Sequence, residues 1–82
     1  MPQHVRVLLF ARYAEVFGAD VIDLSLPLPA TVADVVGRLR DRPGGAELPS
    51  RVLCAVNRRQ AGPECPVEPG DEVALLPPLA GG

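Results

Sequence analysis

The last six residues of the sequence, Pro77-Pro78-Leu79-Ala80-Gly81-Gly82, carry the groups best suited to chemistry. Glycine has no side chain, so a terminal diglycine fits a narrow channel and leaves its carbonyl carbon open to attack. The carboxylate of Gly82 is the reactive group of this segment. Two prolines favour a stiff, extended backbone, and six residues reach at most about 20 Å. The segment is therefore expected to thread into the cleft of a partner and present Gly82 there.

The alternative is that the two glycines have no chemical role. In a chain with 8 Gly among 82 residues, a Gly-Gly end arises by chance at about one per cent from composition alone. Chain ends are also often frayed and rich in glycine. Under this alternative the domain is an interaction module, and its function does not need a free Gly82 carboxylate.

Other residues with reactive side chains form no recognisable site. Cys54 lies inside an apolar run and is expected to behave as a small hydrophobic core residue. Cys65, in a turn-rich stretch, is expected to be an exposed thiol without a role. Neither cysteine has metal-ligand spacing, and His4 follows no local signature. The sequence therefore predicts no metal site.

Composition limits the class of protein. The chain has 82 residues, 48% of them hydrophobic and 22% charged, which suits one small globular domain. The net charge of −2, without a basic stripe or an aromatic platform, argues against nucleic acid as a partner. The apolar runs are too short to span a membrane, and the N-terminus lacks the pattern of a signal peptide. We expect a cytoplasmic protein.

All eight basic residues are arginines. A chain without lysine offers no side-chain amine to which further copies of itself could be linked. The sequence thereby excludes roles that require side-chain-linked chains of this protein.

The first third of the chain predicts two strands joined by a short helical turn. Residues 4–10 are rich in β-branched and large apolar side chains, which favours a strand. Residues 11–17 are expected to form a helical turn that Gly18 closes. Residues 20–26 alternate, with Ile22, Leu24 and Leu26 on one face, as in a half-exposed strand. The short connection suggests that the two strands pair antiparallel.

The main helix is expected to begin after Thr31. Thr31 is a good N-cap with Asp34 three residues later, a variant of the capping box. Four aliphatic residues follow at helical spacing and form one apolar face: Val32, Val35, Val36 and Leu39. Gly37 costs about 1 kcal/mol relative to alanine in a helix interior. The stretch 42–45, Arg-Pro-Gly-Gly, ends the helix.

The second half of the chain predicts short strands and tight turns. Residues 43–50 are expected to be a loop, and 52–56 a central strand buried on both faces. Residues 57–59 form a turn with solvated arginines at 58 and 59, and any strand within 60–68 is short. Residues 69–71 form another turn, and 73–76 the last strand. The order is that of an α+β ubiquitin-like β-grasp: a mixed sheet of four to five strands on one main helix, with residues 1–76 as the domain and 77–82 as an extended tail.

Two pairs of residues allow more than one role. Asp71 and Glu72 are expected to complete a turn, although they could form an acidic pair that faces a partner. Phe10 and Phe17 are expected to pack in the core, although they could form a docking patch.

Several short motifs along nearly the whole chain occur together in one known family. They are Val7-Leu8-Leu9-Phe10-Ala11, Glu15 with Gly18, Thr31-Val32, Ala55-Val56-Asn57, Gly70-Asp71-Glu72-Val73-Ala74 and Pro77-Pro78-Leu79-Ala80-Gly81-Gly82. With these motifs the chain resembles the small, sulfur-carrying subunit of molybdopterin synthase, the MoaD branch of the MoaD/ThiS ubiquitin-like carriers. One departure is Ala14, where the family often has arginine; here an arginine stands at position 12.

The resemblance implies a chemical role for the tail. A ubiquitin-activating-like adenylating enzyme would use ATP to adenylate Gly82, and a sulfur donor would convert the adenylate to a thiocarboxylate. Pro78, Leu79, Ala80 and Gly81 would then insert into the large synthase subunit, where sulfur passes to a pyranopterin precursor of the molybdenum cofactor. This chain would bind no cofactor itself. It would act as a non-catalytic donor subunit of a sulfurtransferase, with the catalytic residues in the large subunit and a heterotetrameric assembly.

The resemblance leaves a second carrier role open. A related sulfur carrier could serve thiamine, cysteine or a thiolated tRNA base. Both carrier roles need the free Gly82 carboxylate, whereas a β-grasp interaction module does not.

Overall fold

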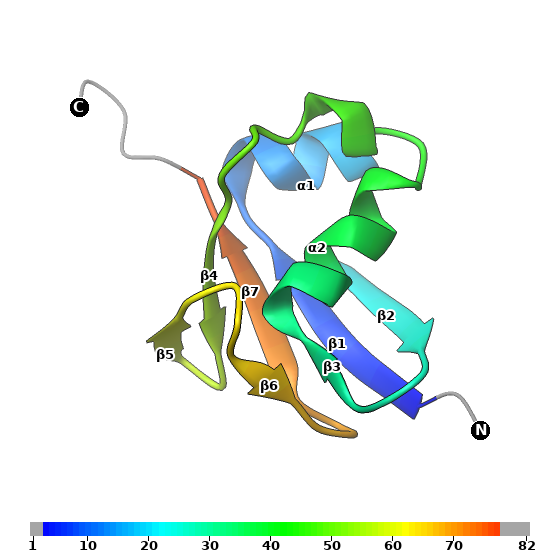
Figure 1. Ribbon diagram of the computed structural model, residues 1–82. Helices are drawn as coiled ribbons and strands as arrows, with labels where there is room; N and C mark the ends of the chain where they lie inside the picture. Colours follow the sequence, from blue (N-terminus) through cyan, green and yellow to red (C-terminus); the bar gives the residue numbers. More distant parts are fainter. Residues whose placement is uncertain (1–2, 78–82) are drawn as a thin grey trace.

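The computed structural model describes residues 3–77, which form one five-stranded sheet, a small two-stranded sheet and two α-helices (Figure 1). The elements, in chain order, are β1 (Gln3–Leu9), α1 (Ala11–Phe17), β2 (Val21–Leu26), β3 (Ala30–Thr31), α2 (Val32–Arg40), the 3₁₀ helix η1 (Gly45–Glu47), β4 (Leu53–Val56), β5 (Arg59–Ala61), β6 (Pro66–Val67) and β7 (Glu72–Leu76). Neither α-helix is long and apolar enough to cross a membrane within this described part of the chain.

The large sheet has the strand order β2-β1-β7-β4-β5. β1 pairs with β2 antiparallel and with β7 parallel, while β4 pairs antiparallel with both β7 and β5. The last strand therefore lies beside the first, and the sheet is mixed, both as predicted. This arrangement with α2 across one face is an α+β ubiquitin-like β-grasp. The antiparallel pair of β3 and β6 was not predicted.

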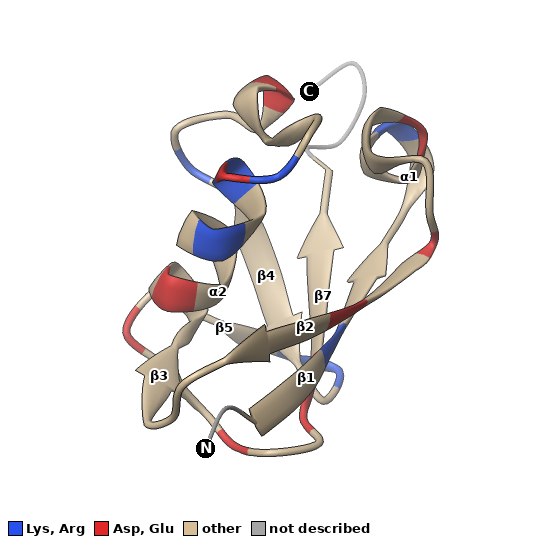
Figure 2. Ribbon diagram, turned by 90° about the vertical axis from the view of Figure 1, so that its right-hand side faces the viewer, with Lys and Arg blue, Asp and Glu red and all other residues tan. Residues whose placement is uncertain are grey.

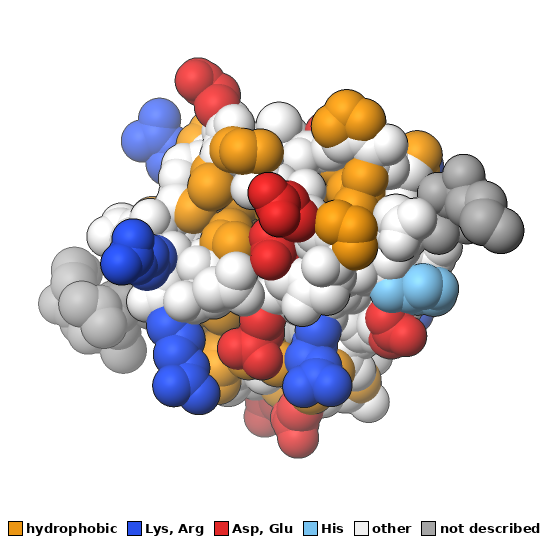
Figure 3. Space-filling model, turned by 90° about the horizontal axis from the view of Figure 1, so that it is seen from below, with side chains coloured by type: hydrophobic (Ala, Val, Ile, Leu, Met, Phe, Trp, Pro, Cys, Tyr) orange, Lys and Arg blue, Asp and Glu red, His pale blue; other side chains and the backbone are white. Residues whose placement is uncertain are grey.

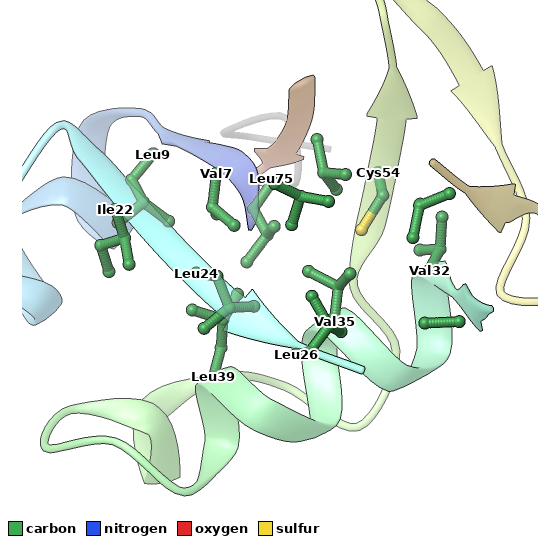
Figure 4. Packing of buried hydrophobic residues seen from close by; sticks show 14 of the residues in the cluster. Val7, Leu9, Ile22, Leu24, Leu26, Val32, Val35, Leu39, Cys54 and Leu75 are labelled. Atoms are coloured by element: carbon green, nitrogen blue, oxygen red, sulfur yellow. The ribbon is translucent and has the colours of Figure 1, made fainter. Parts of the chain in front are cut away.

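The hydrophobic core lies between α2 and the near face of the large sheet (Figure 4). The predicted alternation in β2 is confirmed, because Ile22, Leu24 and Leu26 are buried and the residues between them are exposed. Val35 and Leu39 of α2 are completely buried against them. Burial of such aliphatic side chains is the main force that holds a small domain together.

Local signals at both helices also agree with the prediction. The backbone N–H of Thr31 donates to Oδ2 of Asp34 at 2.8 Å, and the N–H of Asp34 donates to Oγ1 of Thr31 at 3.4 Å, which completes the capping box. Gly18 ends α1 with φ of 71°, and its N–H donates to the carbonyl of Ala14. These contacts depend only on neighbouring residues, which is why the sequence revealed them.

Three predictions about exposure were wrong. Leu53 in β4 is 46% exposed and Phe10 is 47% exposed, so neither is a core residue. The reason is that α2 covers only one face of the sheet, and alternation along β1 and β4 turns these two side chains to the other face. Cys65 was expected to be exposed, but it is partly buried against the core. Cys54 is buried and Phe17 packs against the core, as predicted.

The segment between α2 and β4 is more ordered than the predicted loop. It contains η1, and Gly44 ahead of it has φ of 94°. A Cβ atom on Gly44 would lie 2.6 Å from the carbonyl oxygen of Val16, so glycine allows the loop to pack directly on the end of α1. The loop therefore closes the same end of the molecule at which β7 ends.

Candidate functional site

The described residues define where the predicted reactive tail begins. Gly82 and the four residues that were expected to insert into a partner, Pro78, Leu79, Ala80 and Gly81, lie outside the described residues. β7 ends at Leu76, which pairs with Leu53 of β4, and Pro77 follows. β1 and β7 run parallel, so their C-terminal ends point to the same end of the sheet, where α1 also lies (Figure 2). The tail thus leaves from an interior strand of the sheet.

The face of the sheet that α2 does not cover is apolar at this end. The pairing places Leu8 beside Val21 and Ala74, and Ala74 beside Ala55. We define the open apolar face by the residues that share this side near the end of β7: Leu8, Phe10, Val21, Leu53, Ala55, Ala74 and Leu76. Its three large exposed members, Phe10, Val21 and Leu53, are 46% to 50% exposed. Contiguous exposed apolar residues of this kind mark interaction sites.

The other half of the same face is charged. Arg6 lies between Asp23 and Glu72 in the strand register. Nδ1 of His4 lies 3.3 Å from Oδ1 of Asp23, with both side chains largely exposed. Figure 3 looks at the end of the molecule opposite the one where β7 ends, and acidic, basic and hydrophobic side chains are interspersed there. The apolar surface is therefore confined to the half of the face from which the tail leaves.

A small polar network fixes the start of β7. Nδ2 of Asn57 donates to Oδ1 of Asp71, and Oδ1 of Asn57 accepts the backbone N–H of Glu72 at 3.0 Å. Oδ2 of Asp71 also accepts the N–H of Glu68 at 2.8 Å. Asp71 therefore completes its turn, as predicted. The network ties the β4–β5 turn to the β6–β7 turn and so holds the strand that bears the tail.

The first helix and η1 flank the tail end. Nη2 of Arg12 lies 3.6 Å from Oε1 of Glu47, an exposed ion pair that contributes little to stability. Ala14, at the position where the resembled family often has arginine, packs against the core. Arg12 of α1 thus contacts η1, and the position at which the family often has arginine is occupied by Ala14.

Buried ionisable groups near this end are not arranged for catalysis. Burial raises the pKa of the Cys54 thiol to about 11, which disfavours a nucleophilic thiolate at neutral pH. Burial, followed by the nearby Cys54, raises the pKa of Tyr13, whose hydroxyl has no hydrogen-bond partner among the described residues. Within residues 3–77, no cluster of three or more His, Cys, Asp or Glu side chains could hold a metal ion.

Comparisons with known proteins identify the family of this chain. The model of the ThiS family matches residues 7–82. The molybdopterin synthase sulfur carrier subunit of Homo sapiens is 33% identical over 82 residues, which covers 95% of this chain and 93% of that protein. The subunit of the same description from Escherichia coli K12 is 32% identical over 80 residues, covering 95% of this chain and 99% of that protein.

Solved structures show the same fold. Small archaeal modifier protein 1 from Haloferax volcanii is 28% identical with a TM-score of 0.82, covering 96% of this chain and 99% of that one. A putative molybdopterin converting factor subunit 1 from Pyrococcus furiosus is 27% identical with a TM-score of 0.83, covering 94% and 99%. On the match over residues 7–82 and the identity to curated carriers over nearly their full length, this chain belongs to the ThiS family of ubiquitin-like proteins, together with the sulfur carrier subunits of molybdopterin synthase.

Proposed function

We propose that this chain is the sulfur carrier subunit of a molybdopterin synthase, with Gly82 as the residue that bears the sulfur. The observation that carries the proposal is the similarity to curated sulfur carrier subunits over 95% of the chain. The family match extends to residue 82 and so includes the diglycine. The open apolar face beside the end of β7 supports a role in which a partner receives the tail.

The proposed chemistry begins with activation of the carboxylate. A carboxylate is a poor electrophile, so the Gly82 oxygen attacks the α-phosphorus of ATP on a partner adenylating enzyme and pyrophosphate leaves. The outer sulfur of a persulfide donor then attacks the acyl carbon, and AMP leaves as its C–O bond to that carbon breaks. A thiol next attacks the donor's sulfur in the resulting acyl disulfide and becomes oxidised to a disulfide with the donor, while the S–S bond to the acyl sulfur breaks. Gly82 is released as a thiocarboxylate. This chain supplies only the acyl group; ATP binding belongs to the partner.

The second stage takes place in the large synthase subunit. The tail residues Pro78 to Gly81 lead the thiocarboxylate to a pyranopterin precursor. Its sulfur forms a bond to a carbon of that substrate, and the bond from this carbon to an oxygen leaving group breaks. Water then hydrolyses the resulting thioester and restores the Gly82 carboxylate. The general acid and base groups for these steps are assigned to the large subunit, because the described part of this chain offers no catalytic constellation near the tail.

The open apolar face is the proposed docking surface for the large subunit. A partner that takes the tail must contact the protein around Pro77, and the surface that surrounds the end of β7 is the apolar half of the sheet. Burying exposed aliphatic and aromatic side chains provides affinity. The stiff Pro77-Pro78 step reduces the conformational entropy that the tail loses on insertion.

The proposal is tested by loading the tail. The chain is incubated with an adenylating enzyme, ATP and a sulfur source, and intact mass spectrometry should show exchange of one oxygen for sulfur. A chain without Gly82, and one with an added residue after it, should stay unchanged although both fold. An unchanged mass of the native chain, under conditions that load a control carrier, would contradict the carrier role. The loaded chain, mixed with the large subunit and precursor, should then yield molybdopterin.

A second candidate function has one observation in its favour. The structural neighbours from Haloferax volcanii are described as small archaeal modifier protein 1, with TM-scores of 0.82 and 0.83. An activated Gly82 could equally acylate an amine of another protein. Stable amide-linked conjugates in the host, with none of the synthase subunit bound, would favour this function. A carrier for another sulfur pathway would load its tail but fail to yield molybdopterin.

A further inference from the structure

A groove lies on the opposite side of the sheet from the open apolar face, between α2 and the edge of the sheet at β4 and β5. Its volume is about 750 Å³, and its walls are α2, residues 50–53 before and at the start of β4, and residues 60–63. Leu53 stands at its rim and is the one residue that it shares with the open apolar face. None of the residues that line this groove has a part in the proposed sulfur chemistry.

The backbone around the groove suits an extended chain. β5 pairs with β4 only from Cys54 to Val56, whereas β7 pairs with β4 from Leu53 onward. Gly62 and Pro63 follow β5 directly and form part of the groove wall. The register places Gly62 opposite Leu53, where the pairing of β4 with β5 has ended. The edge of the sheet beside the groove is therefore β5, whose outer side pairs with no strand among the described residues. Such an edge is a template for a peptide that adds to the sheet.

The groove lining suits aliphatic side chains. Most of its wall consists of small or aliphatic residues, of which the largest are Val32, Val36, Val52, Leu53 and Pro63. Gly37 lowers the helical wall: it is exposed, and a Cβ atom there would meet no described atom within 4 Å. Glycine at such a position costs about 1 kcal/mol in helix stability without a packing reason. If another chain approaches α2 closely at this point, the lack of a side chain at Gly37 has a packing reason.

The groove carries positive charge from Arg40 and Arg51, which favours a ligand with an acidic group. Arg40 donates from Nη1 to the carbonyl oxygen of Leu48 at 3.2 Å, and from Nη2 to those of Pro49 and Ser50 at 2.6 and 3.3 Å. These neutral carbonyl partners fix the guanidinium without neutralising its charge. Arg51 is exposed at the same wall. Neither arginine belongs to an ion pair among the described residues, and no acidic side chain lines the groove. A carboxylate of a bound chain would face two unneutralised guanidinium groups.

We propose that this groove is a second protein-binding site, which takes an extended peptide segment with aliphatic side chains next to one or more acidic residues. The partner is a protein other than the one that receives the tail, because the groove lies on the other side of the sheet. The open edge of β5 selects an extended backbone, the lining selects aliphatic side chains, and Arg40 and Arg51 select the carboxylate. Binding here does not depend on Gly82.

The test uses the full-length ¹⁵N-labelled chain and two blocked probe peptides, Val-Leu-Val-Ile-Glu-Glu and its reverse. Either peptide should shift amide signals of residues 50–53, 60–63 and α2, and leave those of Leu8 and Ala74 on the open face in place. Replacing both glutamates by glutamine, or Arg51 by glutamate (Arg51→Glu), should weaken binding about tenfold, as expected for a charge-assisted hydrogen bond. Arg58→Glu, an exposed arginine outside the groove, is the matched control.

Three results of the peptide titrations would overturn the proposal. They are no shift with either peptide at millimolar concentration, equal affinity of the Arg51→Glu variant, or shifts centred on the open apolar face. Concentration-dependent shifts of the same groove signals without peptide would also overturn it, since they would mean that a second copy of the chain occupies the groove. A variant without Gly82 should bind as the native chain does, so the outcome is independent of the proposed sulfur chemistry.

Discussion

Nδ2 of Asn57 donates to Oδ1 of Asp71 at 3.1 Å and joins two turns that are 14 residues apart in the sequence. Asn57 has φ of 50°, a left-handed conformation that asparagine tolerates better than most residues. Its N–H also donates to the carbonyl of Glu72 at 2.8 Å. The side chain and backbone of Asn57 together fix where β7 begins, and therefore where the strand that bears the tail lies against β4.

We expect Asn57→Ala to reduce the free energy of unfolding by about 1–3 kcal/mol, because it removes two hydrogen bonds and places alanine at positive φ. Asn57→Gly should cost less, since glycine keeps the backbone conformation. Urea denaturation measures both changes. A double-mutant cycle with Asp71→Ala should give a coupling energy of about 1 kcal/mol; additive losses would mean that the Asn57–Asp71 contact is not formed in solution.

A polar group on the open apolar face should weaken binding to the large subunit. We expect Phe10→Asp to raise the dissociation constant at least tenfold, because the 47% exposed ring would otherwise be buried against the partner and a carboxylate would lose hydration there. Titration calorimetry with the large subunit measures the effect. Arg58→Asp, on the turn at the other end of β4, is the control. Equal affinities of the two variants would exclude this face as the docking surface.

The two glycines around α2 should respond to alanine in opposite ways. Gly37 has helical backbone and open space at Cβ, so we expect Gly37→Ala to stabilise the fold by up to about 1 kcal/mol. Gly44→Ala should destabilise it, because φ is 94° and the new Cβ would approach the carbonyl of Val16. Chemical denaturation compares the two variants. Destabilisation by Gly37→Ala would mean that the helix interior is not free to accept a side chain.

Alkaline pH should destabilise the fold through Cys54. Burial raises its pKa from 9.0 to about 11, so in the interval between these values the unfolded chain loses a proton that the folded chain keeps. The contribution is therefore fully present below about pH 9 and is lost as the pH rises toward 11. Tyr13, whose pKa is also raised, acts in the same direction at higher pH.

Thermal unfolding between neutral pH and pH 11 measures this dependence. Cys54→Ala should lower the melting temperature at neutral pH, since it leaves a small cavity, and should flatten the fall of stability above pH 9. An equally steep fall in the variant would assign the alkaline destabilisation to other groups.

Many local features of the fold could be read from the sequence, because their causes lie within a few residues. Alternation predicted which side chains of β2 are buried, and the Thr31–Asp34 pair predicted the start of α2. Gly18 and Gly70 occur where the backbone has positive φ, as turn and cap signals indicated. The parallel pairing of β1 with β7 followed only from the order of elements together with the resemblance to a β-grasp.

Exposure could not be read in the same way. Leu53 and Phe10 belong to apolar runs, and an apolar run looks the same in sequence whether one or both faces of its strand are covered. The β3–β6 pair was missed because each strand has only two residues, too few for a periodic signal. The groove was missed because its walls come from three separate parts of the chain.

The sequence by itself determined the family and the positions of the turns and caps, because these depend on residue types and on short spacings. The tertiary structure alone decided that the apolar half of an uncovered sheet face surrounds the strand from which the diglycine tail leaves. It also decided that Arg40 and Arg51 line the same groove on the opposite side. The apolar half of the sheet face and the groove both result from the register of the strands and from the single helix that covers the sheet. Register and helix position decide which residues that are distant in the sequence become neighbours.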